Sequence, residues 1–224
     1  VHEIEVSGNG AFGRDDVEAA VRSILAGRRW RFFPADNFLA VSPAHFAAEL
    51  RARFPQAAEV RVEKRFPDTI RVDIAGRALW GVYCERRAAD VPPRSCFYLD
   101  RRGTAYESLA AFSGWLLPII FGGETPALGR AAVPEATLAF FNDADRALAG
   151  VGGGLLALYL STTTPGDARL ALAEGWQLLV TATRPVAEWR GILATVLEKE
   201  IGPRQSELEY VDLRFGSKVF FKYR

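Results

Sequence analysis

The stretch Val60–Ile74, VRVEKRFPDTIRVDI, decides how the N-terminal part of the chain folds. Branched apolar residues alternate with charged ones on both sides of a Phe-Pro-Asp-Thr break. Alternation with a period of two places the apolar side chains on one face of a strand and the charges on the other. Pro67 restricts φ and donates no ladder hydrogen bond, and Asp68 can bond to the backbone two residues on, so the break is typical of a turn. The sequence therefore predicts a β-hairpin with one apolar face that helices can cover.

One short strand and two helices are predicted ahead of this hairpin. Residues His2–Ser7 alternate polar with apolar, as in an amphipathic strand. A helix is expected from about Asp15 to Ala26, because two aspartates suit its positive N-terminal end and Gly27 suits its stop. Ser42-Pro43 predicts the start of a second helix, with the serine as N-cap and the proline at the first helical position. Residues 1–76 are therefore expected to form a compact β-α-α-β-β unit.

The remaining residues, 77–224, alternate between runs of strands and single helices. Helices are predicted over Pro134–Leu148 and from about Pro185 to Ile201, where apolar residues recur at helical spacing. Strands are predicted at Leu79–Cys84, Cys96–Asp100, Leu155–Leu160, Arg169–Leu172, Gln177–Thr181 and in the closing segment Leu208–Arg224. Helices separated by runs of hairpin strands indicate an α+β domain built on an antiparallel sheet.

Motifs from both ends of the chain resemble one family of proteins. Two helices that lead into a strand with an RFP turn (65–67), and Trp80 shortly after the hairpin, resemble the POTRA module of FtsQ/DivIB-type cell-division proteins. VSGN (6–9), FYLDRRG (97–103) and the closing VDLRFGSKVFFK (211–222) resemble further parts of the same family. The fold class expected on this basis is α+β, with a POTRA-like domain at residues 1–76. A FtsQ/DivIB-like β domain, a larger antiparallel sheet with flanking helices, is expected at residues 77–224.

The resemblance implies a non-enzymatic scaffold of the septal cell-division complex, with FtsB/DivIC and FtsL-type proteins as partners. Such a protein is held in the cell membrane by a single N-terminal helix, and this segment would lie on the extracytoplasmic side at the division site. The chain contains no methionine, so Val1 is not an initiator, and we expect the membrane helix upstream of it. An alternative is the POTRA module of an outer-membrane assembly or secretion protein. The lack of a second such module and of a long strand-rich barrel region weighs against that alternative.

Composition and charge are those of a soluble globular segment. Apolar residues make up 49% and charged residues 25% of the chain, and the formal net charge is +1. Because a nucleic-acid partner requires a basic face or stripe, this balance argues against nucleic-acid binding. The one local exception, Arg28–Phe33, is interpreted as a loop with packed aromatics and solvated arginines. The apolar stretches Ala147–Gly166 and Leu109–Phe121 are broken by glycine or proline and do not predict a spanning helix.

The glycines of Gly8–Gly13, GNGAFG, suggest a different class of protein. A strand, a GxGxxG turn and a helix in this order bind the pyrophosphate of a dinucleotide, and would make the chain an NAD(P)-dependent oxidoreductase. Against this, the first strand is not apolar on both faces, as a central parallel strand is. Asp15 and Asp16 also place negative charge where the pyrophosphate should lie. The oxidoreductase therefore remains the weaker alternative.

Beyond the glycine-rich turn Gly8–Gly13, the sequence contains no catalytic, metal or cofactor motif. The two histidines, His2 and His45, lie in no nucleophile–base pattern, and neither GxSxG, HExxH nor a P-loop occurs. The acidic cluster Asn142–Asp145 lies within a predicted helix and lacks the glycine and distal glutamate of a calcium loop. The prediction is a protein without enzymatic activity, although a carboxylate pair formed only by the fold has no signature in sequence.

Cys84 and Cys96 are the only cysteines, and they lie at the end of one predicted strand and the start of the next. They could therefore face each other at the mouth of a hairpin and form a disulfide, which requires an oxidising compartment. Two buried free thiols are the alternative, since pairing cannot be read from sequence. A zinc site is not expected, because no further thiol or histidine lies nearby.

The closing segment, Glu209–Arg224, is the predicted partner-binding site. A terminal strand lies naturally at a sheet edge, where unpaired backbone groups can accept an added strand. The resemblance assigns the docking of FtsB/DivIC to this region. The partner-binding residues predicted on both grounds are Asp212, Leu213, Arg214, Phe215, Val219, Phe220 and Phe221. The alternative is that Leu213 and Phe215 are core residues and that Asp212 and Arg214 form a pair within the domain.

Overall fold

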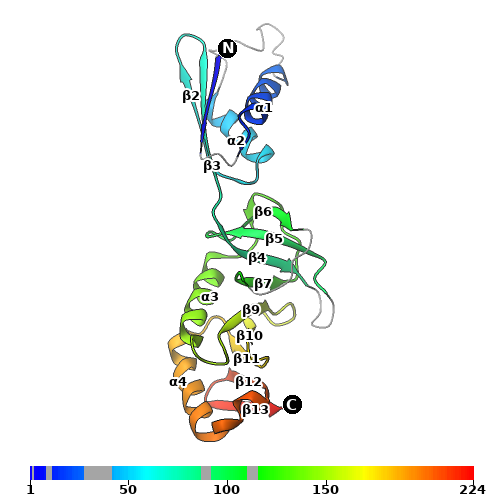
Figure 1. Cartoon of the computed structure of the whole chain (residues 1–224), viewed down its shortest axis with the longest axis vertical. Helices are drawn as coiled ribbons and strands as arrows, with labels where there is room; N and C mark the ends of the chain where they lie inside the picture. Colours follow the sequence, from blue (N-terminus) through cyan, green and yellow to red (C-terminus); the bar gives the residue numbers. More distant parts are fainter. Residues whose placement is uncertain (2, 9–11, 28–41, 87–91, 110–115) are drawn as a thin grey trace. The chain divides into compact units, whose positions relative to one another are not determined.

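The computed structural model describes residues 1, 3–8, 12–27, 42–86, 92–109 and 116–224 (Figure 1). These residues form two compact units, Val1–Ala78 and Leu79–Arg224. Helices and strands are mixed in both units, and the strands form two separate sheets. The predicted α+β class is therefore confirmed.

The first unit is a three-stranded sheet with two helices (Figure 1). Its elements are β1 (Glu3–Gly8), α1 (Arg14–Gly27), α2 (Pro43–Arg53), β2 (Ala57–Arg65) and β3 (Thr69–Gly76). The central strand, β3, pairs in parallel with β1 and antiparallel with β2. The alternating apolar residues of the hairpin are all buried, and they pack in one core with apolar residues of α1 and α2. The predicted β-α-α-β-β order is present.

The start of α2 differs in detail from the prediction. Ser42 occupies the N-cap position with an extended backbone, φ −96° and ψ 111°, but its side chain makes no capping hydrogen bond. Pro43 does occupy the first turn. Here the restricted φ of proline, rather than the serine hydroxyl, is what favours the helix start.

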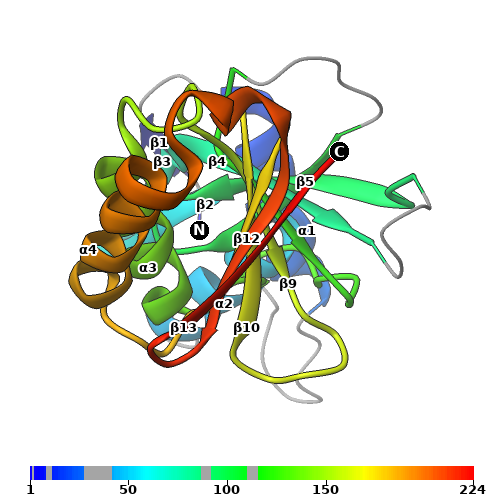
Figure 2. The same cartoon turned by 90° about the horizontal axis from the view of Figure 1, so that it is seen from below.

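The second unit is a ten-stranded sheet with two helices packed on one face (Figures 1 and 2). The strands in chain order are β4 (Leu79–Glu85), β5 (Ser95–Asp100), β6 (Thr104–Leu109), β7 (Ile119–Gly122), β8 (Arg130–Ala131), β9 (Leu155–Leu160), β10 (Asp167–Leu172), β11 (Gln177–Thr181), β12 (Leu208–Phe215) and β13 (Lys218–Tyr223). The helices are α3 (Glu135–Leu148) and α4 (Val186–Val196); α4 continues as a π-helical turn, Leu197–Ile201, and a 3-10 turn, Gly202–Glu207. The order across the sheet is β13-β12-β11-β10-β9-β7-β4-β5-β6-β8.

This sheet is antiparallel at most of its pairings but mixed overall. β7 pairs in parallel with both β4 and β9, and β11 pairs in parallel with β12. The sequence did not predict β7, whose four residues are all buried. A short strand that is buried on both faces lacks the period-two pattern of a half-exposed strand.

Two neighbouring rows of register partners define the two faces of the large sheet. Directly opposed residues on adjacent strands project from the same face. The helix-side row, which faces α3 and α4, is Phe221, Val211, Leu178, Leu170, Leu158, Ile120, Tyr83 and Phe97. The opposite row is Phe220, Asp212, Leu179, Arg169, Tyr159, Phe121, Cys84, Cys96 and Leu109. Among the described residues, the buried cluster on this opposite face includes none from α3 or α4.

Two local features fix the β4–β5–β6 part of the sheet. Cys84 and Cys96 are register partners with their Cα atoms 4.1 Å apart, and they are joined by a disulfide. In the FYLDRRG segment, a side-chain oxygen of Asp100 accepts the backbone N–H groups of Arg102 at 2.8 Å and Thr104 at 2.9 Å. Gly103 has φ +74°, and a Cβ there would lie 2.3 Å from a backbone oxygen. The aspartate and the glycine of this motif are therefore both required by the turn.

Across the described residues, no helix is long and apolar enough to cross a membrane.

Candidate partner-binding edge strand

The last strand, β13, forms one edge of the large sheet. It pairs antiparallel with β12 through a hairpin whose turn contains Gly216 at φ +67°. Among the described strands, β13 has β12 as its sole neighbour. In an antiparallel strand, half of the backbone N–H and C=O groups point away from the neighbouring strand. The outward groups of β13 therefore form a row along the edge of the sheet.

Three phenylalanines in this hairpin are exposed to solvent. Phe215 is 56% exposed, Phe220 is 52% exposed and Phe221 is 37% exposed. Phe215 and Phe220 contact each other edge to face, with ring centroids 5.5 Å apart. Phe220 belongs to the opposite row and Phe221 to the helix-side row, so the edge carries an aromatic side chain on each face.

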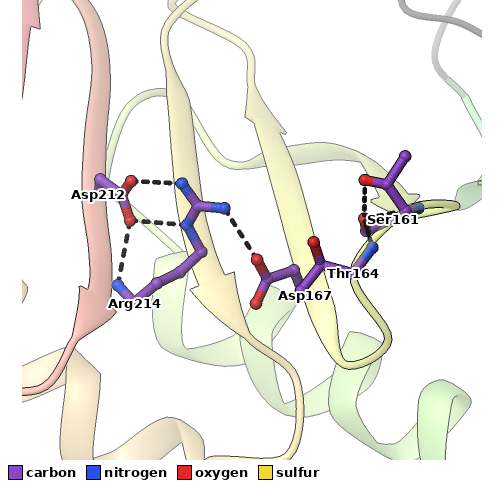
Figure 3. Close-up of polar contacts among 6 residues, drawn as sticks. Ser161, Thr164, Asp167, Asp212 and Arg214 are labelled. Carbon is purple, nitrogen blue, oxygen red and sulfur yellow. Dashed lines mark hydrogen bonds and ion pairs between the residues drawn. The ribbon is translucent and has the colours of Figure 1, made fainter.

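Arg214 and Asp212 form an ion pair within β12, and Arg214 also reaches across β11 to Asp167 (Figure 3). Arg214 Nε and Nη2 lie 2.9 and 2.6 Å from the two carboxylate oxygens of Asp212, and Nη1 lies 2.8 Å from Asp167 Oδ2. The hydrogen bonds that the guanidinium donates to Asp212, and then the one to Asp167, raise the pKa of Arg214 above its ordinary value. The guanidinium is therefore a permanent cation that two carboxylates hold in place.

The predicted partner-binding residues thus fall into two groups. Leu213 is buried in the core and Val219 packs against it, so neither offers the exposed surface of an anchor. Asp212 is buried, and its carboxylate is bound by Arg214. The exposed members of the set are the phenylalanines, Phe215, Phe220 and Phe221. The alternative interpretation, in which Leu213 is a core residue and Asp212 pairs with Arg214 within the domain, agrees with these contacts. Phe215, which that interpretation also placed in the core, is exposed.

Contacts at the C-terminal end of β13 were not found by sequence reasoning. Lys222 Nζ lies 2.5 Å from Glu209 Oε2, and this hydrogen bond raises the pKa of Lys222. Arg224 donates to the backbone oxygens of Leu208 and Glu174, each at 3.1 Å. These partners lie up to 50 residues away in the sequence, so only the fold brings them together. They hold β13 in register beside β12.

The other sheet edges differ from β13 in their side chains. In the first unit, the edge strand β1 contains no aromatic residue. The other edge strand, β2, carries exposed charges, including an ion pair between Arg61 and Glu59 at 3.0 Å. The far edge of the large sheet, β8, is two residues long. Charged side chains and short length both discourage the pairing of an edge with another chain. The described edge with exposed aromatic residues is therefore β13.

The glycines considered for dinucleotide binding are only partly described. Gly8 ends β1, and a Cβ at this position would lie 2.2 Å from the backbone oxygen of Ile74 on β3. Close strand packing therefore explains this glycine without a nucleotide. Asn9, Gly10 and Ala11 lie outside the described residues, as does the Arg28–Phe33 segment. Among the described residues, no group of three or more His, Cys, Asp or Glu side chains could hold a metal ion.

Comparison of the sequence with models of protein families and with curated proteins finds no match.

Proposed function

We propose that this chain is a non-enzymatic binding module whose edge strand β13 accepts a β-strand from a partner protein. The observation that carries the proposal is the exposed edge of a ten-stranded sheet that presents phenylalanines on both of its faces. Backbone hydrogen bonds to the edge would supply affinity, and the side chains that alternate along the added strand would supply specificity.

The chemistry of the edge defines the partner segment. The partner's segment is extended, and it is apolar at the positions that contact Phe220 and Phe221. Exposed aromatic rings are stabilised most by contact with apolar or aromatic groups. Lys218 is exposed at the start of β13 and favours a partner with an acidic residue at the matching end. The Arg204 guanidinium, 3.9 Å from the Tyr223 ring centroid, covers the other end of the strand.

The biological setting that we propose follows from the resemblance to FtsQ/DivIB-type proteins. In this proposal the chain is the extracytoplasmic part of a single-pass membrane protein that scaffolds the septal division complex. Its partners are FtsB/DivIC and FtsL-type proteins, and FtsB/DivIC supplies the added strand. The Cys84–Cys96 disulfide supports an oxidising compartment, since such bonds are rare in the cytosol.

The test is binding of the extracytoplasmic segment of FtsB/DivIC, measured by calorimetry, to the whole chain and to single variants. Phe220→Ala should weaken binding about 30-fold, the loss of a buried aromatic anchor worth ~2 kcal/mol. Phe66→Ala is the matched control, because Phe66 is 90% exposed but lies in the first unit. Equal binding by both variants and the unaltered chain would reject the edge strand as the site.

A further inference from the structure

The turn between β2 and β3 presents an aromatic side chain to solvent. Phe66 is 90% exposed, a larger fraction than for any of the three phenylalanines of the β12–β13 hairpin. Pro67, the next residue, is exposed as well. A single exposed apolar residue is common on protein surfaces and needs no explanation by itself. The place of this turn in the first unit is what gives it a meaning.

The register of the small sheet puts the turn at the end where the chain enters the first unit (Figure 1). Glu3, the first residue of β1, is the register partner of Thr69, the first residue of β3. Thr69 is also paired with Arg65, the last residue of β2. Neighbouring strands lie about 4.8 Å apart. The start of β1 and the Phe66–Asp68 turn are therefore side by side.

The chain leaves the first unit at the other end of the same sheet. β3 ends at Gly76, which is paired with Ala57 at the start of β2. The 8 residues of β3 span about 23 Å, at roughly 3.3 Å per step. Entry to the unit and exit from it thus lie at opposite ends of β3, and the exposed turn belongs to the entry end.

The charges beside the turn are of both signs. Lys64 and Arg65 precede it, whereas Asp68 lies within it and Glu3 lies on the neighbouring strand. Arg65 Nη1 is 3.4 Å from Glu5 Oε2. These residues give the turn no excess of positive charge, which is what attracts a protein to anionic lipid headgroups. Contact at this end would therefore depend on the apolar ring of Phe66.

We propose that the Phe66–Asp68 turn docks on the surface of a lipid bilayer, with the Phe66 ring at the boundary between headgroups and acyl chains. Aromatic and apolar side chains are stabilised at that boundary. The choice of a lipid partner rests on the proposed function, in which a membrane helix lies upstream of this segment. In that setting the chain reaches β1 from the membrane, so the turn is the part of the sheet beside the point of entry.

The membrane attachment explains how one side chain is sufficient. A free protein would not be held by a single phenylalanine, because association costs translational and rotational freedom. For a chain already attached to the bilayer, the second contact is intramolecular and most of that cost is absent. The turn then fixes which end of the first unit faces the lipid.

The experiment supplies the attachment and measures which end of the small sheet faces the bilayer. The whole, isotope-labelled chain is extended ahead of Val1 by a flexible Gly-Ser linker and one cysteine, and is coupled to maleimide lipid in phosphatidylcholine nanodiscs. A gadolinium chelate on the headgroups broadens amide signals, and the effect falls steeply with distance. We expect stronger broadening at Asp68 and Thr69 than at Ala57 and Gly76, at the other end of the same strands. Equal broadening at the two ends would overturn the proposal.

Two variants show whether Phe66 causes this difference. Phe66→Ser should lower the ratio of docked to undocked turn about tenfold, the loss expected when an aromatic side chain no longer leaves water. Leu116→Ser is the matched control, because Leu116 is 98% exposed but lies in the second unit, and it should leave the difference unchanged. Thermal melting checks that each variant is folded. An undiminished difference in Phe66→Ser, or an equal decrease in Leu116→Ser, would contradict the role of the ring.

The lipid composition separates apolar docking from attraction by charge. Addition of phosphatidylglycerol to the discs should leave the difference between the two ends unchanged. A difference that appears only with this anionic lipid and persists in Phe66→Ser would overturn the proposal.

The outcome does not depend on strand addition at β13. The discs contain no partner protein and the linker provides the attachment, so failure of FtsB/DivIC to bind leaves this measurement unaffected. Shifts of Asp68 and Thr69 on addition of the FtsB/DivIC segment without lipid, together with equal broadening on the discs, would assign the turn to a protein partner instead.

Discussion

The guanidinium of Arg214 binds both carboxylate oxygens of Asp212, two residues before it on the same strand, at 2.9 and 2.6 Å. The Asp212 side chain is 7% exposed. A buried carboxylate without its cation is costly, because desolvation is then uncompensated. This pair is therefore part of the structure of β12.

Replacing Arg214 should destabilise the second unit. Arg214→Ala leaves the Asp212 carboxylate buried without its bidentate partner, and we expect a loss of about 2 kcal/mol in the free energy of unfolding. That loss corresponds to a melting temperature lower by about 5 °C. Urea unfolding followed by tryptophan fluorescence measures it, because Trp176 and Trp189 are fully buried in this unit. An Arg214→Ala protein as stable as Arg190→Ala would show that the pair does not contribute.

The Cys84–Cys96 disulfide should contribute to stability as well. It closes a loop with a sequence separation of 12 residues, and a cross-link of this size contributes about 3 kcal/mol in the chain-entropy model. A Cys84→Ser, Cys96→Ser double variant should therefore unfold at lower urea concentration. Mass spectrometry after alkylation without reductant should detect no modified thiol in the unaltered, air-oxidised protein. Two alkylated cysteines in that sample would contradict the pairing.

We expect Tyr83 to make the free energy of unfolding decrease at alkaline pH. Burial raises the pKa of its phenol above 10.0, and its hydroxyl donates a 2.8 Å hydrogen bond to the backbone oxygen of Glu124. The neutral phenol is favoured in the folded state, so its contribution is fully present below pH 10 and is lost as the pH rises through the higher folded-state pKa. Urea unfolding at pH 8 and at pH 11 should show a smaller loss of stability in Tyr83→Phe than in the unaltered chain. Equal losses would contradict this assignment.

A substitution at Gly8 distinguishes between two interpretations of the glycine-rich turn, close strand packing and dinucleotide binding. A Cβ at this position would lie 2.2 Å from the backbone oxygen of Ile74, so Gly8→Ala should disturb the pairing of β1 with β3 and lower the melting temperature of the first unit. NAD and NADP should give no saturable change in tryptophan fluorescence with the unaltered chain. Micromolar binding of either nucleotide, lost in Gly8→Ala without a loss of stability, would favour the oxidoreductase.

Much of the fold could be predicted because the deciding signals are local. The alternation of Ile70, Val72 and Ile74 identified a buried strand face, and all three side chains are buried. The starts of α3 and α4 at Pro134 and Pro185 were also readable, because proline is disfavoured in a helix interior; both prolines occupy the N-cap position. The parallel pairing of β7 was not readable, because its partners β4 and β9 are distant in sequence and its residues are uniformly apolar.

The candidate site was less predictable for the same physical reason. Sequence placed the terminal strand at an edge, but the burial of Leu213 and the exposure of Phe215 depend on the face that each residue occupies in a strand with a register shift. The ion pair of Arg214 with Asp167 joins residues 47 positions apart. A single sequence carries no signal for a pair at that separation, and the fold alone brings the two groups together.

The central claim, that β13 accepts a partner strand, is tested most directly by backbone amide hydrogen exchange of the whole chain, with and without the extracytoplasmic segment of FtsB/DivIC. Added backbone hydrogen bonds slow the exchange of the amides that form them. The account predicts that the segment slows exchange at outward-facing amides of Lys218–Tyr223, while the edge strand β2 in the first unit is unchanged. Slowed exchange at β2 or elsewhere, with no change along β13, would contradict it.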